Sequence, residues 1–359
     1  MDDLYDPDPL AQTTLRPRRG RGAPTNPVGR FESMDLEIEQ TDDDLPVQET
    51  ELFRDSTRSI IAWNDSPDLN FDASVNPYRG CEHGCAYCYA RPTHEYLGLS
   101  AGLDFESKLF VKENAPELLE KTFSSRSWKP QDVMMSGVTD CYQPIERHLK
   151  LTRRCLEVFA EFRNPVGIVT KNELVTRDID ILQTMSSPDV AAVHMSVTSL
   201  DPALANKLEP RASSPRRRIK AIEALSRAGV RTGVVIGPVI PGLNDHEISD
   251  ILQASADAGA RSAGYITLRL PHGVKELFAD WLEAHYPNRK DRVLNRVRDT
   301  RDGELYDGKY GLRMRGAGEY ADQIERMFEI RKRKAELTQK LPPLSTGHFR
   351  VPRKQLSLF

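Results

Sequence analysis

Two patterns of apolar residues alternate along the middle of the chain. Short runs rich in valine and isoleucine are typical of buried strands. They occupy residues 132–137, 166–170, 190–197, 231–236 and 262–268, with shorter strands expected at 59–63 and 71–76. Between them, apolar residues recur at helical spacing, which predicts helices over 151–162, 178–185, 215–228 and 246–258. This alternation predicts a parallel sheet with right-handed crossovers and six strand–helix units counted from Phe71.

The two ends of the chain lack this alternation. Residues 1–57 are rich in proline, glycine and arginine and then in acidic residues, so we expect a disordered tail. After Pro271, helices are expected at 274–285 and 319–338. The predicted organisation is therefore a tail (1–57), a core (58–272), a helical C-terminal extension (273–342) and a flexible tail (343–359).

Basic residues gather in two places, at 16–21 in the first tail and at 331–334 near the end of the last predicted helix. Such clusters attract the phosphates of nucleic acid, and they also occur as ordinary solvated surface. Both interpretations stay open for each cluster.

Length and composition limit the kinds of protein to which this chain can belong. Its 359 residues, 39% of them hydrophobic, suffice for one large α/β barrel. No apolar run approaches the roughly 18 residues of a membrane span. The first ten residues have neither the basic nor the apolar region of a secretory signal. We therefore expect a cytoplasmic protein that needs no membrane partner.

Three of the five cysteines, Cys81, Cys85 and Cys88, fall within eight residues. In a reducing compartment such clustered thiols usually bind metal, because thiolates are soft ligands. The Cys-x3-Cys-x2-Cys spacing offers three ligands and no obvious fourth, and a [4Fe–4S] cluster held by three cysteines keeps one iron open. A zinc site completed by His83 or His94 is the alternative, although zinc ligands are normally spaced in pairs. A disulfide would leave one of the three thiols unpaired.

This spacing, with Tyr87 just before the third cysteine, resembles the signature of the radical S-adenosylmethionine (SAM) enzymes. The resemblance implies that the open iron binds SAM and that the reduced cluster cleaves it to a 5′-deoxyadenosyl radical, which abstracts hydrogen from a substrate. It also implies a partial (β/α)6 TIM barrel, which matches the six units above, and an electron donor such as a reductase or a flavodoxin-type protein. Barrel ligands bind at the carboxyl ends of the strands, where the cysteine loop falls.

The region from Asn76 to about Leu270 resembles the spore photoproduct lyase branch and its DNA-repair-photolyase-like relatives. The likeness rests on three segments that follow predicted strands: Thr139-Asp140, Thr170-Lys171-Asn172 and His194-Met-Ser196-Val-Thr198. In that family the matching residues contact SAM, so the resemblance implies that Thr139, Asp140, Lys171 and Ser196 position it, beside Tyr87.

Simple chemistry supports part of this assignment. Gly137 lets backbone approach a ligand, and Asp140 offers oxygens to a cation, although an aspartate there also suits a helix cap. Arg211 and Arg218 lie in an arginine-rich stretch at the start of a predicted helix, and the guanidinium of either suits the ribose or carboxylate of SAM or a substrate phosphate.

One departure from the lyase pattern concerns the hydrogen donor. The lyase has a cysteine just before its Thr-Ser-Asp, and Gly137 takes that place here. Cys141 and Tyr142, which follow Asp140, are the candidates for a hydrogen-atom donor or radical relay. The alternative for Cys141 is a buried structural cysteine. Cys155 has apolar neighbours at helical spacing and is expected in the core.

The chain ends in Gln355-Leu-Ser-Leu-Phe359, which resembles the peptide that docks bacterial DNA polymerases and repair proteins on the replication sliding clamp. Leu356, Leu358 and Phe359 would fill apolar pockets while Gln355 forms a polar anchor. The alternative is an apolar end that folds onto its own domain.

These observations together predict a radical SAM enzyme that acts on nucleic acid, with a DNA lesion or modified base ahead of RNA. Two alternatives remain. One is a radical SAM enzyme for a small molecule or peptide, and the other is a non-catalytic iron–sulfur protein associated with DNA or the clamp.

Overall fold

The computed structural model describes residues 20–23, 30, 49–187, 189–338 and 343–352. Its centre is a seven-stranded sheet in the order β10-β9-β8-β7-β6-β3-β2. The parallel strands are β3 (Ala73–Val75), β6 (Val133–Met135), β7 (Val166–Thr170), β8 (Ala191–Ser196), β9 (Arg231–Val239) and β10 (Ser262–Thr267). β2 (Ile61–Trp63) pairs antiparallel with β3. The edge strands β10 and β2 do not pair with each other, so the sheet stays open. The six parallel strands confirm the predicted partial barrel.

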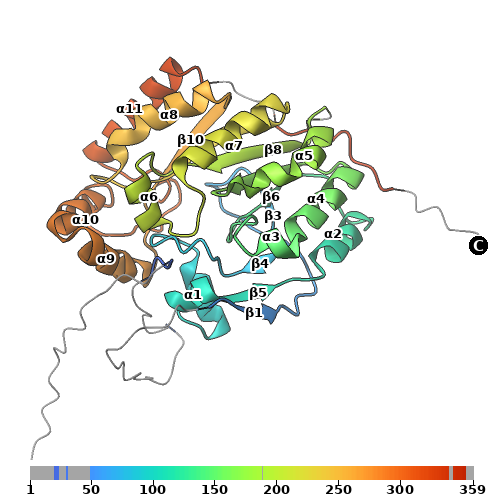
Figure 1. The fold of residues 1–359 in the computed structure, drawn as a ribbon, viewed down its shortest axis with the longest axis horizontal. Coiled ribbons are helices and arrows are strands. Elements are labelled where there is room, and N and C mark those ends of the chain that lie inside the picture. The colour runs from blue at the N-terminus through green and yellow to red at the C-terminus, as the bar shows by residue number, and fades with distance from the viewer. Residues whose placement is uncertain (1–19, 24–29, 31–48, 188, 339–342, 353–359) are drawn as a thin grey trace, which may run out of the picture.

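Helices cover the outer side of this sheet (Figure 1). They are α2 (Ala115–Phe123), α4 (Leu151–Phe162), α5 (Ile179–Ser186), α7 (Pro215–Arg227) and α8 (Ile248–Asp257). In α4 the buried side chains recur every three or four residues, and they include Cys155, which lies in the main core as expected. Because each helix buries one apolar stripe against the strands, the carboxyl ends of the strands stay open for a site.

A second, three-stranded sheet was not predicted. β1 (Glu51–Arg54) runs parallel to β5 (Lys108–Val111), which also pairs with β4 (Tyr78–Arg79). The prediction of a disordered segment at 1–57 is therefore wrong for residues 51–54. All four β1 residues are exposed, so this strand shows no buried hydrophobic pattern. It is held by backbone pairing and by the Phe53 ring, which stacks on that of Phe110 with centroids 5.2 Å apart.

Several short elements connect the strands. They are the helices α1 (Leu103–Ser107), α3 (Glu146–Leu149) and α6 (Pro202–Leu208), and the 3₁₀ segments η1 (Arg91–Leu97), η2 (Glu173–Asp178), η3 (Asp245–Glu247) and η4 (Pro287–Arg289). η1 follows the cysteine loop directly, and α1 packs near it. These elements fix the loops that surround the carboxyl ends of the strands.

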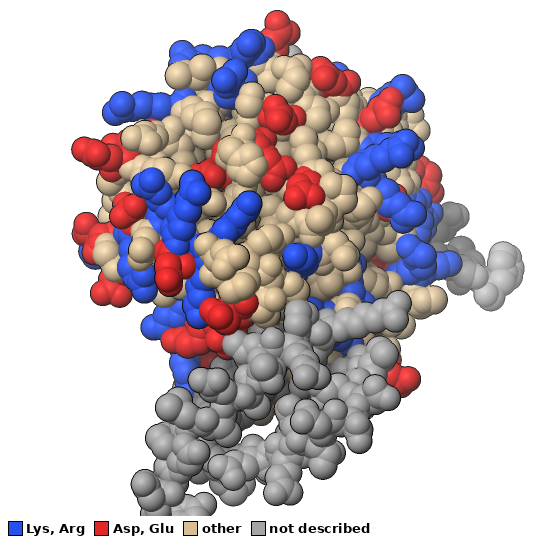
Figure 2. Space-filling view, turned by 60° about the vertical axis from the view of Figure 1, so that its left-hand side comes forward, with Lys and Arg blue, Asp and Glu red and all other residues tan. Residues whose placement is uncertain are grey.

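The C-terminal extension is helical, as predicted. It contains α9 (Val274–His285), α10 (Lys290–Asp299) and α11 (Glu319–Lys334). It contacts the end of β10, where the Thr267 amide donates to the carbonyl of Met314 over 2.9 Å. On the face shown in Figure 2, Lys and Arg side chains alternate with Asp and Glu and form no single basic tract. Among the described residues, no helix has the length and apolar character needed to cross a membrane.

Candidate functional site

The cysteine loop lies beyond the carboxyl end of β3, after the short strand β4. Its backbone is fixed by a hydrogen bond from the Cys81 amide to the Phe105 carbonyl (2.9 Å) and by a turn in which the Cys88 amide donates to the Cys85 carbonyl (3.2 Å). Gly84 has a φ of 63°, in the left-handed region that favours glycine. All three thiols are free; Cys81 and Cys85 are buried, and Cys88 is half-buried.

The donor set of this loop fits an iron–sulfur cluster. Burial raises the pKa of Cys88 to about 11 and that of Cys85 well above its ordinary value, with neighbouring cysteines adding to both shifts. Thiolates are therefore unfavourable here unless a positive centre binds them, and a coordinated metal deprotonates its thiols. In the described ranges no three His, Cys, Asp or Glu side chains are arranged to hold a single metal ion. Cysteines that bind a [4Fe–4S] cluster sit on different irons.

A buried ion pair holds the backbone of the cysteine loop in place. Arg91 and Glu106 lie 2.5 Å apart and both side chains are fully buried. Arg91 also donates two hydrogen bonds to the Cys85 carbonyl, at 3.0 and 2.8 Å. Because a guanidinium holds several acceptors in a fixed plane, this contact sets the direction of the loop backbone at Cys85.

Residues 21–23 of the N-terminal segment complete this brace. The amides of Gly22 and Ala23 donate to the two Glu106 carboxylate oxygens at 3.0 and 2.8 Å, and Arg21 donates to the Glu106 carbonyl at 2.7 Å. Arg21 is buried, whereas the sequence suggested an exposed basic cluster at 16–21. The rest of that cluster lies outside the described residues. The prediction of a disordered tail is wrong for residues 21–23, because their polar groups pair with a buried carboxylate.

Gly22→Ala is expected to expel this segment from the loop. A Cβ at Gly22 would lie 1.6 Å from the Gly84 carbonyl oxygen, which leaves no room for a methyl group. Trypsin should then cleave after Arg21 at least about tenfold faster, because proteolysis follows the population of the open state. Gly347→Ala, whose Cβ would meet its nearest side-chain atom at 3.8 Å, is the control. Equal cleavage rates would show that the contact does not hold the segment.

His83 and Asp140 join the cysteine loop to the ends of β6 and β7. His83 Nδ1 lies 3.3 Å from Asp140 Oδ2, and its Nε2 lies 3.3 Å from Asn172 Nδ2. Burial alone would lower the pKa of His83, but Asp140 and Cys81 raise it to about 10. Asp140 also accepts hydrogen bonds from the Thr170 hydroxyl and the Lys171 amide, both at 2.8 Å. The Asp140 carboxylate thus orients the loop around the cysteines.

Lys171, Ser196 and Tyr87 converge at the ends of β7 and β8, and their roles toward SAM stay predictions. Lys171 Nζ donates to Ser196 Oγ over 2.6 Å and lies 5.7 Å from the centre of the Tyr87 ring. The same ammonium is 3.3 Å from the fully buried Glu209, which also accepts from the Tyr87 hydroxyl. Arg218 forms a second, fully buried ion pair with Glu209.

Glu209 is the residue that sequence reasoning missed. Burial alone would raise its pKa, but Arg218 and Lys171 hold it well below its ordinary value. Its partners are 9, 38 and 122 positions away along the chain (209 to 218, 171 and 87). A buried carboxylate between two cations keeps a charged lysine in an otherwise costly position. Its only sequence signal was a glutamate within an arginine-rich stretch.

The other predicted cofactor residues have partners within the protein. Arg211 pairs with Glu82 at 2.9 Å, next to Cys81. Thr139 is buried and donates to the Tyr78 carbonyl at 3.2 Å. The Gly137 carbonyl accepts from the Tyr89 hydroxyl at 2.7 Å. These contacts place all of them around the cysteine loop, while their roles toward SAM stay predictions.

Cys141 and Tyr142 lie in the main core. Both side chains are fully buried, and the Tyr142 hydroxyl donates to Asp178 at 3.1 Å. Their roles as hydrogen-atom donor or radical relay stay predictions. Tyr89, which sequence reasoning overlooked, is 45% exposed beside the third cysteine.

Known proteins resemble this chain in sequence. An uncharacterized protein of Mycobacterium tuberculosis is 33% identical over 221 residues, which are 61% of this chain and 65% of that protein. This chain thus spans just under two thirds of that relative's length. A spore photoproduct lyase of Clostridium acetobutylicum is 24% identical over 279 residues, 74% of this chain and 72% of the lyase.

Solved structures and a family model agree on the fold. A spore photoproduct lyase complexed with dinucleoside spore photoproduct superposes with a TM-score of 0.57 at 17% identity, over 83% of this chain and 85% of the lyase. The model of the radical SAM superfamily matches residues 75–254, half of the chain. The match begins at the last residue of β3 and includes all three clustered cysteines. Members of this superfamily use a [4Fe–4S] cluster and S-adenosylmethionine, and on this evidence the chain belongs to the radical SAM superfamily.

Proposed function

We propose that this protein is a radical SAM enzyme whose substrate is nucleic acid, with a DNA lesion or modified base as the reacting group. The observation that carries the proposal is the convergence of a braced three-cysteine loop and the Lys171–Ser196–Glu209 cluster at one end of the sheet. When bound, the [4Fe–4S] cluster supplies the electron that cleaves SAM to a 5′-deoxyadenosyl radical. A reductase or a flavodoxin-type protein is the proposed electron donor.

Each group of residues has a separate role in this proposal. Cys81, Cys85 and Cys88 hold the cluster, which leaves one iron for SAM. Lys171 and Ser196 present an ammonium and a hydroxyl to the polar end of SAM, because an ammonium suits its carboxylate. Thr139, Asp140, Gly137, Tyr87 and Arg211 shape the surrounding loops.

The choice of nucleic acid rests on the relatives. The superposed lyase is complexed with dinucleoside spore photoproduct, and one sequence relative is also named spore photoproduct lyase. A base inside a duplex would have to be extruded to reach the open end of the sheet. The catalytic core in this proposal is 58–272, with the helical extension at 273–342 supporting β10.

The test is substrate-dependent cleavage of SAM. Anaerobically reconstituted protein would be reduced with dithionite, given SAM, and assayed for 5′-deoxyadenosine with undamaged DNA, ultraviolet-irradiated DNA, RNA or peptides. We expect one nucleic acid to accelerate its formation and to bind with an affinity that falls steeply with salt, because phosphate contacts release counterions. Cleavage that only peptides or small molecules accelerate would contradict the nucleic-acid assignment and support that alternative.

We also propose that the last five residues dock on the bacterial sliding clamp. They lie outside the described residues, so the proposal rests on the motif alone. Deleting residues 355–359 is expected to abolish clamp binding in a pull-down with purified clamp, because Leu356, Leu358 and Phe359 supply the apolar anchors. A form with Gln355 to Phe359 in scrambled order is the control. Retention of the clamp by the deleted form would contradict this proposal.

A further inference from the structure

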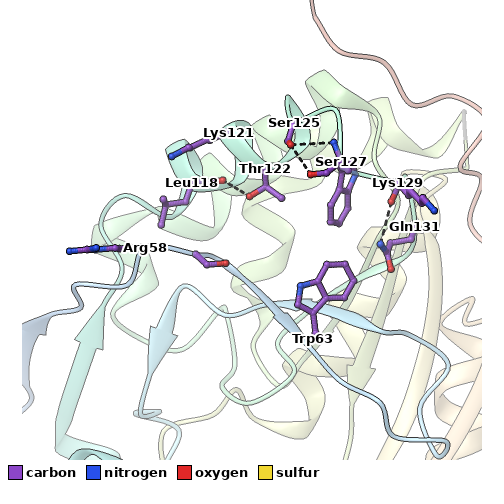
Figure 3. Close-up of a pocket in the computed structure, with 11 residues that line it drawn as sticks. Arg58, Trp63, Leu118, Lys121, Thr122, Ser125, Ser127, Lys129 and Gln131 are labelled. Atoms are coloured by element: carbon purple, nitrogen blue, oxygen red, sulfur yellow. Dashed lines mark hydrogen bonds between the residues drawn. The ribbon is translucent and has the colours of Figure 1, made fainter.

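A hollow of about 550 Å³ lies between β2 and the segment that leads into β6 (Figure 3). Trp63 forms one wall, and residues of α2 and the following turn form the other. Its size is within the usual range for ligand sites. It is separate from the cysteine loop. Trp63 pairs with Ala73, the first residue of β3, and the cysteine loop follows the other end of that strand.

Two indole rings line this hollow. Trp63 is 64% exposed on the outermost strand of the sheet, although a tryptophan side chain is costly to leave in water. Trp128 is half-buried and fixed, because its Nε1 donates to Asn164 at 3.0 Å and its ring packs 5.1 Å from that of Phe123. The two indole centroids are 6.1 Å apart with planes at 43°, so the rings do not stack on each other. A flat face of Trp63 is therefore available to a ligand.

The charged residues around the rings all have one sign. Arg58, Lys121 and Lys129 line the hollow, and none of the described residues that line it is acidic. Within the described part of the chain, these three cations form no ion pair with any carboxylate. Elsewhere on the surface, as Figure 2 shows, basic and acidic side chains alternate. Ser125 and Ser127 add hydroxyl groups on the same wall, where Figure 3 shows them hydrogen-bonded to each other.

We propose that this hollow, the Trp63 pocket, binds single-stranded nucleic acid by stacking an unpaired base on Trp63 and by pairing flanking phosphates with Arg58, Lys121 and Lys129. An aromatic face beside a set of unpaired cations is the combination that single strands require, since every base has a π-face and every linkage a negative charge. Bases within a duplex are covered by their neighbours and cannot stack on a side chain. The inference deepens the proposed function, on which its choice of ligand rests.

The pocket's position gives it a separate task from the reaction. Its two indole rings lie at the amino end of β3, whereas the cysteines and Lys171 lie at the carboxyl ends of the strands. A strand held there is bound away from the reacting base. The pocket therefore contributes affinity for unpaired nucleic acid that flanks the reacting base.

The experiment measures binding of a fluorescein-labelled oligothymidylate of about 20 nucleotides, a length above the usual site size of one binding module. Fluorescence anisotropy of the full-length protein is recorded over a salt series. Trp63→Ala is expected to weaken binding about 5- to 150-fold, the contribution of one base–aromatic stack, and Trp63→Phe to weaken it less. Tyr310→Ala removes a 57% exposed aromatic elsewhere and should change nothing. A mononucleotide should compete poorly, because it offers one phosphate to three cations.

The cations are tested by the slope of the logarithm of the binding constant against the logarithm of the salt concentration. Arg58→Gln/Lys121→Gln/Lys129→Gln is expected to reduce the slope by about 2, since each phosphate contact on a single strand contributes about 0.7. Lys220→Gln/Arg227→Gln/Arg261→Gln, at three exposed cations that do not line the hollow, removes the same charge and should leave the slope unchanged.

Three results would overturn the inference, and they are distinguishable. If the wild type binds the oligonucleotide and Trp63→Ala binds it equally well, the pocket assignment fails while the proposed function stands. If the wild type binds no nucleic acid at all, the proposed substrate class fails as well. If Trp63→Ala abolishes a concentration-dependent dimer in light scattering and leaves oligonucleotide binding intact, the pocket is a protein interface.

Discussion

Replacement of Cys81, Cys85 or Cys88 by alanine is expected to prevent assembly of the iron–sulfur cluster and to reduce SAM cleavage more than about 100-fold. Removing a residue that only hydrogen-bonds a metal ligand lowers metal affinity or activity about 10- to 100-fold. Removing a ligand itself should lower them further. The three thiols lie in one loop whose backbone is held by Arg91. The other two described cysteines, Cys141 and Cys155, are outside this loop and buried, so we expect neither to replace a lost ligand. Iron and sulfide content, visible absorption and 5′-deoxyadenosine yield would measure the effect.

Cys155→Ala and Cys141→Ala are the matched controls for these variants. Both side chains are fully buried in the main core, and neither belongs to the cysteine loop. They should keep the wild-type iron content after reconstitution. If Cys141→Ala lost iron while one of the three loop variants retained it, the assignment of the ligands would be wrong.

Glu209→Gln is expected to destabilise the protein by about 3–5 kcal/mol, the usual effect of removing one partner of a buried ion pair. Glutamine keeps the volume of glutamate but leaves Arg218 buried without its carboxylate. Lys171 would also lose a partner at 3.3 Å, so the KM for SAM should rise. Urea unfolding followed by circular dichroism would measure the loss of stability.

The control for this variant is Glu173→Gln, which removes a pair with the exposed Arg217 and should cost no more than about 1 kcal/mol. A second variant tests the physical cause. Glu209→Gln/Arg218→Met leaves no unpaired guanidinium and should recover much of the lost stability. Equal losses for Glu209→Gln and Glu173→Gln would contradict a central role for the buried carboxylate.

The same carboxylate predicts a pH dependence. Its folded-state pKa lies well below the ordinary value of 4.5, so its contribution to stability is present above that pH and is lost as the pH falls. The difference in unfolding free energy between the wild type and Glu209→Gln should therefore shrink as the pH drops below about 4.5. A difference that grew on acidification would have the wrong sign for this account.

The elements predicted most accurately were those with strong periodicity. The bounds of α4, β7 and α9 match the predicted ranges, because a continuous apolar run or stripe marks each of them. All residues of β1 are exposed, and α10 buries only Val293, Leu294 and Val297 in a mostly charged sequence, so neither produced a clear pattern. Pairing partners distant in sequence determine such elements.

In the candidate site, too, some residues could be found from the sequence and others could not. Local spacing identified the three cysteines, and the resemblance to the lyase branch led to Lys171 and Ser196, which contact each other. The buried partners Glu106 and Glu209 act through contacts with distant segments, so no local motif marks them. Cys141 and Tyr142 were chosen because they follow Asp140, but adjacency in an irregular loop does not tell which way a side chain points.

The most direct test of the central claim is electron paramagnetic resonance of the reduced, anaerobically purified protein before and after SAM is added. The account predicts a [4Fe–4S]⁺ signal whose g-values shift on addition of SAM, because SAM binds the iron that carries no cysteine. The shift should be absent when Cys81, Cys85 or Cys88 is alanine. A colourless protein that contains only zinc, or a cluster signal that SAM leaves unchanged, would contradict the account.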